Sequence, residues 1–186
     1  VSPRDGLQSE SIFISSEKKI EYIRLLSAAG LSEIEITSFV SPRWVPQMAD
    51  HEIVTAALQK DQNHRYSVVV PNQCGYENAQ RLGVKRMAFL TAASDVFCEK
   101  NLGCSYLESI RRVTNLLSHS QQESLWRRVY ISCVFDCPYE GLIEQDRVLQ
   151  VVKLMIQAGA DEVCLGDTIG SGTPERTQRM LESIKS

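Results

Sequence analysis

Three absences narrow the roles that this sequence can have. It contains no apolar run near the ~18 residues that a membrane-spanning helix needs, so no membrane partner is expected. It has no run of lysine and arginine, and its net charge is −3, which argues against nucleic acid as a partner. None of its six cysteines forms a Cys-x-x-Cys pair, so we expect reduced thiols and a reducing compartment.

The start of the sequence has no leader of the kind that is first charged and then apolar. We expect the sequence to open inside a strand, so that any upstream targeting segment would be missing from it. The predicted location is the cytoplasm, or the mitochondrial matrix if a transit peptide precedes the printed residues.

The overall composition is ordinary for a globular domain, with 43% hydrophobic and 23% charged residues among 186. Strand-like and helix-like spacing of apolar residues alternate about six times, with no linker between repeats. After an opening strand that ends near Arg4, strands are predicted at residues 33–37, 66–70, 85–90, 129–135 and 162–165. Helices are predicted at residues 15–29, 50–58, 75–82, 105–118, 144–158 and 174–184, with a long loop at 91–104.

This alternation indicates a parallel sheet, either open and doubly wound or closed as a barrel. An open sheet would be complete at this length, whereas a barrel usually needs ~250 residues. However, no glycine-rich phosphate fingerprint follows the first strand, and polar side chains follow nearly every strand, as in barrel enzymes. They belong to Arg4, Asp5, Glu35, Ser38, Asn72, Thr91, Ser94, Ser132, Asp167 and Thr168. We therefore predict an α/β fold of the TIM (β/α)8 barrel type, with residues 1–186 forming about six βα units of a single, partial catalytic domain.

Arg4 and Asp5 stand side by side at the predicted end of the first strand, before Gly6. Two charges beside a core are partly desolvated, which is costly unless they face a site. Arg4 could polarise a carbonyl or bind an anion, and Asp5 could bind a hard divalent cation or move a proton. On these residues alone, an exposed turn with a neighbouring salt bridge is the simpler interpretation.

Four stretches of the sequence match a known family in the family's own order. They are residues 3–8 (PRDGLQ), 36–48 (ITSFVSPRWVPQM), 137–141 (CPYEG) and 166–174 (GDTIGSGTP). In these motifs the sequence resembles the hydroxymethylglutaryl-CoA lyase family, metal-dependent lyases with a TIM barrel of the pyruvate carboxyltransferase type. Leu7 stands where condensing relatives tend to carry glutamate, which favours a lyase.

The resemblance implies retro-Claisen cleavage of hydroxymethylglutaryl-CoA, an acyl-CoA thioester, to acetyl-CoA and acetoacetate, as in leucine breakdown and ketone body formation. It also implies a divalent cation, Mg²⁺ or Mn²⁺, and a homodimer when the protein is complete. The family completes its metal site with a His-x-His pair, an asparagine and a cysteine, all of which would follow Ser186. We therefore expect residues 1–186 to be inactive by themselves.

By the same resemblance, Asp5 is a metal ligand, and Arg4 faces the thioester oxygen where enolate charge develops. A guanidinium in a water-poor pocket suits that task. Glu35 is expected beside Arg4 on a neighbouring strand, where it orients the arginine or balances the charge of the site. Its alternative is a surface position on an alternating strand, although Glu33 fits that description as well or better.

Five further residues complete the expected site. Asp167 and Thr168 would hold the carboxylate end of the substrate, unless Asp167 only binds backbone amides in the turn before a helix. Gln8 and Ser38 would line the pocket. Tyr130 would contact the thioester, unless it is a core tyrosine whose hydroxyl has a protein partner.

Two other functions stay open on the sequence alone. One is a related condensing enzyme of the homocitrate or isopropylmalate synthase type, against which Leu7 argues. The other is a shortened, non-catalytic protein that binds an acyl-CoA.

Overall fold

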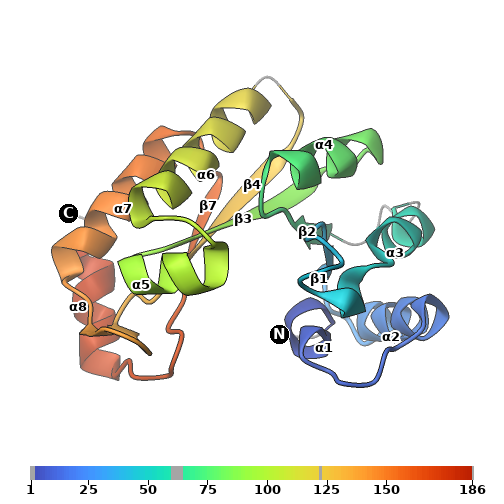
Figure 1. The fold of residues 1–186 in the computed structure, drawn as a ribbon, viewed down its shortest axis with the longest axis horizontal. Coiled ribbons are helices and arrows are strands. Elements are labelled where there is room, and N and C mark those ends of the chain that lie inside the picture. Colours follow the sequence, from blue (N-terminus) through green and yellow to red (C-terminus); the bar gives the residue numbers. More distant parts are fainter. Residues whose placement is uncertain (1–2, 60–64, 122, 186) are drawn as a thin grey trace. The chain divides into compact units, whose positions relative to one another are not determined.

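The computed structural model describes residues 3–59, 65–121 and 123–185 (Figure 1). The chain divides into two units, one of Val1–Ala88 with Ser124–Trp126, the other of Phe89–Glu123 with Arg127–Ser186. In the described ranges, no helix combines the length and the apolar character needed to cross a membrane. All six cysteines are free thiols.

The first unit contains helices and parallel strands in alternation (Figure 1). Its elements are α1 (Arg4–Gln8), α2 (Ser16–Ala28), β1 (Glu33–Ser38), the 3-10 helix η1 (Pro46–Met48), α3 (His51–Leu58), β2 (Arg65–Val69), α4 (Gln73–Arg81) and the first residues of β3 (Arg86–Ala92).

The β-branched run at the end of β2 forms the centre of this unit, because Val68, Val69 and Val70 are each only 1% exposed. After Pro71 the chain turns into α4, and the Asn72 side chain accepts a hydrogen bond from the Gly75 amide at 3.0 Å. Gly75 has no room for a side chain, since a Cβ there would lie 2.8 Å from the Phe39 carbonyl oxygen. The tight approach therefore needs glycine at this position.

Strand β1 carries a β-bulge between Glu35 and Thr37. Glu35 lies opposite Ser67 of β2, and Ser38 lies opposite Val69, so three steps along β1 match two steps along β2. Side chains that lie opposite one another in a sheet share a face, and residues two apart on one strand share a face. The bulge therefore places Glu35 and Ser38 on the same face of the sheet.

The second unit also alternates strands and helices (Figure 1). Its elements are the remainder of β3, α5 (Asp95–Phe97), the π-helix η2 (Cys98–Leu102), α6 (Tyr106–Ser120), β4 (Trp126–Ser132, of which Trp126 belongs to the first unit), β5 (Asp136–Cys137), β6 (Gly141–Leu142), α7 (Gln145–Gln157), β7 (Glu162–Leu165) and α8 (Pro174–Lys185).

Helices α6 and α7 form because each has an apolar stripe at helical spacing. Ser105 begins α6 by accepting a hydrogen bond from the Glu108 amide, and the buried stripe includes Ile110, Val113 and Leu117. The corresponding buried residues of α7 are Val148, Val151, Val152 and Met155. Strand β7 is different, because all four of its residues are only partly buried. This agrees with the position of β7 at one end of the strand order.

The strand order is β1-β2-β3-β4-β7, and the β1–β2, β2–β3 and β4–β7 pairings are parallel. Strands β5 and β6 form a separate antiparallel pair. A parallel sheet in chain order is the arrangement expected of successive βα units, so the predicted α/β class is confirmed. The strand predicted at 162–165 agrees with β7, and the other four agree with β1 to β4 to within three residues at each end.

Some local predictions differ from the structure or concern residues that it does not describe. The opening strand falls partly on residues 1 and 2, which lie outside the described residues. Arg4 does not end a strand but begins the short helix α1. The predicted loop at 91–104 contains the end of β3, α5 and a π-helix, because the Ser94 side chain caps α5 by accepting from the Phe97 amide at 3.0 Å. Strand β4 ends at Ser132, before Cys133 takes a left-handed backbone conformation with φ of 59°.

Candidate functional site

The predicted site residues of the first unit form a hydrogen-bonded cluster around Arg4. Its Nε donates to Glu35 Oε1 at 2.7 Å, and its Nη1 donates to Asp5 Oδ1 at 3.1 Å and to Gln8 Oε1 at 3.3 Å. The Arg4 and Glu35 side chains are 13% and 15% exposed, whereas Asp5 is 57% exposed. The cluster therefore combines a shielded guanidinium with a solvent-facing carboxylate.

Helix α1 and the bulged strand β1 together bring these side chains close to one another. Arg4 and Gln8 are four residues apart on α1, which places them on the same side of the helix. Glu35 reaches Arg4 from β1, and the bulge puts Ser38, 3% exposed, on the same face of the sheet as Glu35. The sequence predicts that Arg4 and Glu35 meet across two neighbouring strands. In the structure a helix and a strand bring them together instead, and the two side chains are in direct contact.

The loop of residues 9–15, which follows α1, is held by Gln47 of η1, and the start of α2 is held by Asp50, the residue before α3. Gln47, 4% exposed, accepts from the Ile14 amide at 2.9 Å and donates to the Ile12 carbonyl at 2.9 Å. Asp50 accepts from Ser16 Oγ at 2.9 Å and from Lys19 Nζ at 2.8 Å, and Lys19 also donates to the Gln47 carbonyl. These contacts fix the segment that connects α1, and hence Arg4, to α2.

The second unit contains Asp167 and Thr168, in the loop between β7 and α8. Asp167 accepts from the Ser171 amide at 3.0 Å and from the Gly172 amide at 2.8 Å. Thr168 Oγ1 accepts from the Cys133 amide at 2.8 Å, which joins this loop to the end of β4. Asp167 thus makes the backbone contacts of the alternative interpretation, and its role toward a substrate stays a prediction.

Tyr130 also has a protein partner. Its hydroxyl accepts a hydrogen bond from Arg128 Nη1 at 3.2 Å, and Arg128 in turn binds Glu162 of β7 at 2.9 Å. This is the arrangement expected of a tyrosine with a satisfied hydroxyl, which was the alternative interpretation of this residue. The proposed contact of Tyr130 with a thioester stays a prediction.

Sequence reasoning missed a second cluster in this unit, formed by Asp136, Ser171 and Arg176. Asp136 Oδ2 accepts from Ser171 Oγ at 2.5 Å and from Arg176 Nη1 at 2.7 Å. Hydrogen bonds from Arg176 and then Ser171 hold the pKa of the Asp136 carboxyl below its usual range, against a smaller opposing effect of burial. The only signal in the sequence was proximity to the motifs: Asp136 directly precedes CPYEG, Ser171 lies within GDTIGSGTP, and Arg176 is the second residue after it.

Two cysteine thiols beside this cluster differ in acidity. Burial raises the pKa of Cys133 to about 11, although a hydrogen bond with Thr168 opposes the shift. Burial also acts to raise the pKa of Cys137, but hydrogen bonds from Ser94 and from the Tyr139 and Glu140 amides outweigh it and lower this pKa below its usual value. Both thiols are at most 2% exposed, so we assign them to packing rather than to chemistry.

A metal site needs several ligands that converge on one point. Among these residues, no three side chains of histidine, cysteine, aspartate or glutamate are grouped so that they could hold a metal ion. Asp5 fits a role as one ligand, because its carboxylate is solvent-facing and oxygen ligands suit Mg²⁺ and Mn²⁺.

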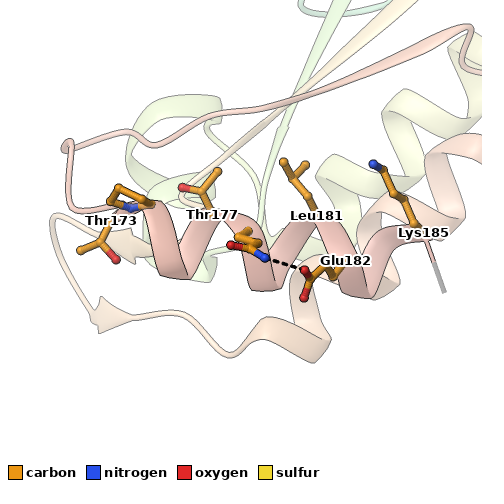
Figure 2. A pocket seen from close by; sticks show the side chains of 8 residues that line it. Thr173, Thr177, Leu181, Glu182 and Lys185 are labelled. Carbon is orange, nitrogen blue, oxygen red and sulfur yellow. Dashed lines mark hydrogen bonds between the residues drawn. The ribbon is translucent and has the colours of Figure 1, made fainter.

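An open depression of about 610 Å³ runs along α8 in the second unit (Figure 2). Thr177, Leu181 and Lys185 project from the same side of the helix, while Glu182 accepts a hydrogen bond from Gln178 at 2.8 Å. None of the predicted site residues lines this depression, so it does not mark the predicted chemistry.

Gly172 offers a test of how closely the Asp167 loop is packed. A Cβ at Gly172 would lie 2.6 Å from Phe135 Cε2 and 2.9 Å from Asp167 Oδ2. We expect Gly172→Ala to lower the free energy of unfolding by about 1–3 kcal/mol, because the ring and the carboxylate must both move. Urea unfolding of the complete protein measures this.

The matched control is Gly170→Ala, where a Cβ meets nothing within 4 Å but the backbone φ is +69°. This variant reports left-handed backbone strain alone, about 1–2 kcal/mol. Wild-type stability and wild-type activity in Gly172→Ala would show that the loop is loosely packed.

The predicted site residues therefore form two groups. Arg4, Asp5, Gln8, Glu35 and Ser38 belong to the first unit, and Tyr130, Asp167 and Thr168 belong to the second. In the first group, hydrogen bonds join Arg4 to Asp5, Gln8 and Glu35. That the two groups act on one substrate stays a prediction.

Comparison with known proteins shows which family has this combination of motifs and fold. The HMGL-like family model matches residues 1–186. The chain belongs to the HMGL-like family. Its α/β sheet is accordingly part of a barrel fold: the solved HMG-CoA lyase of Brucella melitensis superposes with a TM-score of 0.92 at 42% identity, covering 97% of this chain and 64% of that one. The predicted fold class is thus confirmed.

Curated relatives of this HMGL-like chain include lyases from two compartments. The mitochondrial hydroxymethylglutaryl-CoA lyase of Macaca fascicularis is 47% identical over 99% of this chain and 57% of its own length. The cytoplasmic 3-hydroxy-3-methylglutaryl-CoA lyase of Rattus norvegicus is 45% identical over 99% of this chain and 54% of its own length. The chain thus spans little more than half the length of these relatives.

One solved relative has bound ligands. An HMG-CoA lyase from Acinetobacter baumannii, in complex with coenzyme A and 3-methylmalate, has a TM-score of 0.92 and 29% identity over 98% of this chain and 60% of that one.

Proposed function

We propose that the complete protein is a divalent-metal-dependent lyase that cleaves hydroxymethylglutaryl-CoA to acetyl-CoA and acetoacetate. The observation that carries this proposal is the Arg4 cluster in a chain of the HMGL-like family. A shielded guanidinium is held at Nε by Glu35, next to the solvent-facing carboxylate of Asp5. Relatives at 45–47% identity that are named hydroxymethylglutaryl-CoA lyases support it.

Substrate class, oligomeric state and cellular location are part of the same proposal. The substrate is an acyl-CoA thioester, which the coenzyme A complex of a 29% identical relative supports. Residues 1–186 form part of one barrel domain, and the complete protein is a homodimer. It works in the cytoplasm or in the mitochondrial matrix, and relatives whose names say cytoplasmic or mitochondrial support these two locations. Its physiological role is in leucine breakdown and ketone body formation.

In this mechanism Arg4 stabilises negative charge on the thioester oxygen as the carbon–carbon bond breaks and the acetyl-CoA half leaves as an enolate. The Nε bond to Glu35 fixes the plane of the guanidinium before the substrate arrives. A donor that is already oriented in a shielded position does not have to reorganise during the reaction, which is why it favours the transition state. Glu35 is therefore a positioning residue for Arg4.

The metal part of the proposal concerns Asp5. Its carboxylate adjoins the Arg4 guanidinium at 3.1 Å and faces solvent, so it is suited to hold one side of a bound Mg²⁺ or Mn²⁺. When bound, the cation would supply charge that eases removal of the proton from the tertiary hydroxyl. Gln8 and Ser38 line this side of the site.

The second group of residues acts at the other end of the substrate in this proposal. Asp167 and Thr168 shape the loop that surrounds the substrate carboxylate, since their own side chains are bound to backbone amides. Tyr130 contributes its ring beside the thioester while its hydroxyl stays with Arg128.

The direct test is to incubate the purified complete protein with hydroxymethylglutaryl-CoA and a divalent cation. We expect acetoacetate and acetyl-CoA to appear in equal amounts. Condensation of acetyl-CoA with a 2-oxo acid, without cleavage of hydroxymethylglutaryl-CoA, would instead show a synthase of the homocitrate or isopropylmalate type.

A sharper prediction concerns Asp5→Ala. We expect the metal concentration for half-maximal activity to rise by about 10–100-fold, because a carboxylate ligand is lost, while the protein stays folded. Activity is titrated with Mn²⁺, and direct Mn²⁺ binding is measured by calorimetry.

The control for this prediction is Glu21→Ala, which removes an exposed carboxylate from α2 in the same unit. An unchanged metal requirement in Asp5→Ala would remove Asp5 from the metal site.

A further inference from the structure

The Asp136–Ser171–Arg176 cluster connects three segments of the second unit: β5, the loop of residues 166–173, and the first turn of α8. Asp136 and Arg176 are 40 residues apart in the sequence, and their side chains are 20% and 27% exposed. The carboxylate receives two donors on a single oxygen, Oδ2. Such charge-assisted bonds are stronger than bonds between neutral groups.

Arg176 makes more contacts than this ion pair. Its Nη1 also donates to the Ser171 carbonyl at 3.1 Å, its Nη2 donates to the Phe135 carbonyl at 3.3 Å, and its guanidinium carbon lies 5.0 Å from the centre of the Phe135 ring. The guanidinium therefore binds both the hairpin side and the loop side of the cluster.

The position of Arg176 in the helix is itself unfavourable. It lies in the first turn of α8, where the helix dipole disfavours a cation and favours carboxylates such as the neighbouring Glu175. Asp136 supplies the negative charge that offsets this disadvantage. The contact therefore stabilises Arg176 where helix electrostatics would not.

Ser171 links this cluster to Asp167. Its hydroxyl donates to Asp136, its carbonyl accepts from Arg176, and its amide donates to Asp167 Oδ1 at 3.0 Å. The next amide, that of Gly172, donates to Asp167 Oδ2 at 2.8 Å, and Gly172 packs against the Phe135 ring. A shift of Ser171 therefore moves both amides that hold the Asp167 carboxylate.

We propose that Asp136 and Arg176 are positioning residues that hold the loop of residues 166–173, and through Ser171 the Asp167 carboxylate, in the geometry that the lyase reaction needs. This inference rests on the proposed function for its effect on turnover. Its structural part, the coupling of Asp136 and Arg176 to the Ser171 and Gly172 amides, is independent of the reaction.

The test uses the complete protein with Asp136→Asn, Arg176→Gln and the double variant. We expect each single variant to lower kcat for acetoacetate release about tenfold, with KM within about twofold of wild type, because misplacement of a site residue reduces the rate more than binding. The double variant is expected to be no slower than the slower single variant, since both changes break the same cluster. Arg176→Lys should recover part of kcat by restoring one charged donor to Asp136.

The second readout is amide hydrogen exchange at Ser171 and Gly172. We expect exchange at both amides to be at least about tenfold faster in Asp136→Asn and Arg176→Gln, because a broken cluster lets the loop open more often. The matched control is Glu108→Gln on α6, a carboxylate whose pKa is likewise lowered by hydrogen bonds from two arginines, Arg111 and Arg112. This control should leave kcat and both amides unchanged.

The outcomes separate the inference from the proposed function. If wild-type protein releases no acetoacetate but the two amides respond as expected, the proposed function is wrong and the coupling stands. If the amides and kcat in Asp136→Asn and Arg176→Gln change no more than in Glu108→Gln, the inference is wrong while the lyase proposal stands. Additive losses in the double variant would also overturn it, because independent side chains would then be acting.

Discussion

Arg4→Lys is expected to reduce kcat of the complete protein in the proposed lyase reaction by two to three orders of magnitude, equivalent to a loss of ~3 kcal/mol of transition-state stabilisation. Lysine keeps the positive charge but has no planar group that can bind Glu35 through one nitrogen while presenting others to an oxygen. In the wild-type cluster, Nε is committed to Glu35 and Nη1 to Asp5 and Gln8, so the orientation of the whole group is set. Steady-state acetoacetate release measures the effect.

Arg24→Lys is the control for this variant, because Arg24 is exposed on α2 of the same unit. Both variants should have a circular dichroism spectrum and a Tm close to those of wild type. Turnover of Arg4→Lys within a few-fold of wild type would mean that Arg4 serves the fold and not the reaction.

Lys19→Met is expected to cause the largest loss of stability, about 3–5 kcal/mol in the free energy of unfolding. The Lys19 and Asp50 side chains are 4% and 7% exposed, and their ion pair is 2.8 Å long. Removal of the lysine leaves the buried Asp50 carboxylate without its cation, and the neutral Ser16 hydroxyl, which donates at 2.9 Å, cannot replace that charge. Urea unfolding followed by circular dichroism measures the loss.

The comparison is Arg81→Met, which removes an ion pair with Glu52 whose partners are 65% and 52% exposed. Exposed pairs contribute less than about 1 kcal/mol, so this variant should be nearly as stable as wild type. Equal stability losses in the two variants would show that burial of the Lys19–Asp50 pair has no special effect. Addition of Asp50→Leu to Lys19→Met should recover part of the stability, because the uncompensated charge is removed.

The sequence was sufficient to predict the regular elements because their signals are local. The strand at 162–165 is a short apolar run that begins after Gly159 and ends before Gly166, and it is β7 in the structure. Helices α6 and α7 have apolar stripes that need no knowledge of distant residues. The same locality explains why α1 was missed, since five residues carry too short a pattern to show a helical period.

In the candidate site, too, what could be predicted depended on how far apart the residues lie in the sequence. Arg4, Asp5 and Gln8 lie within one five-residue helix, but these residues alone favoured an exposed turn, and their shared site was predicted from the family resemblance. The contact of Arg4 with Glu35 followed from the family resemblance. The Asp136–Arg176 pair was not predicted, because nothing in two segments 40 residues apart indicates which charges meet. Asp167 illustrates a third case, in which the residue was identified but its backbone partners needed a folded loop.

The bulge in β1 makes the length of that strand a constraint separate from its composition. A substitution at Ile36, the extra residue, changes only packing, because the path of the chain on either side is kept. Loss of the same residue would turn Ser38 to the opposite side relative to Glu35, since alternation along a strand reverses with each step. In proteins that share this strand, a gap of one residue between Glu35 and Ser38 would therefore signal a different lining of the proposed site, whereas a gap of the same size in the loop after Ser38 would not.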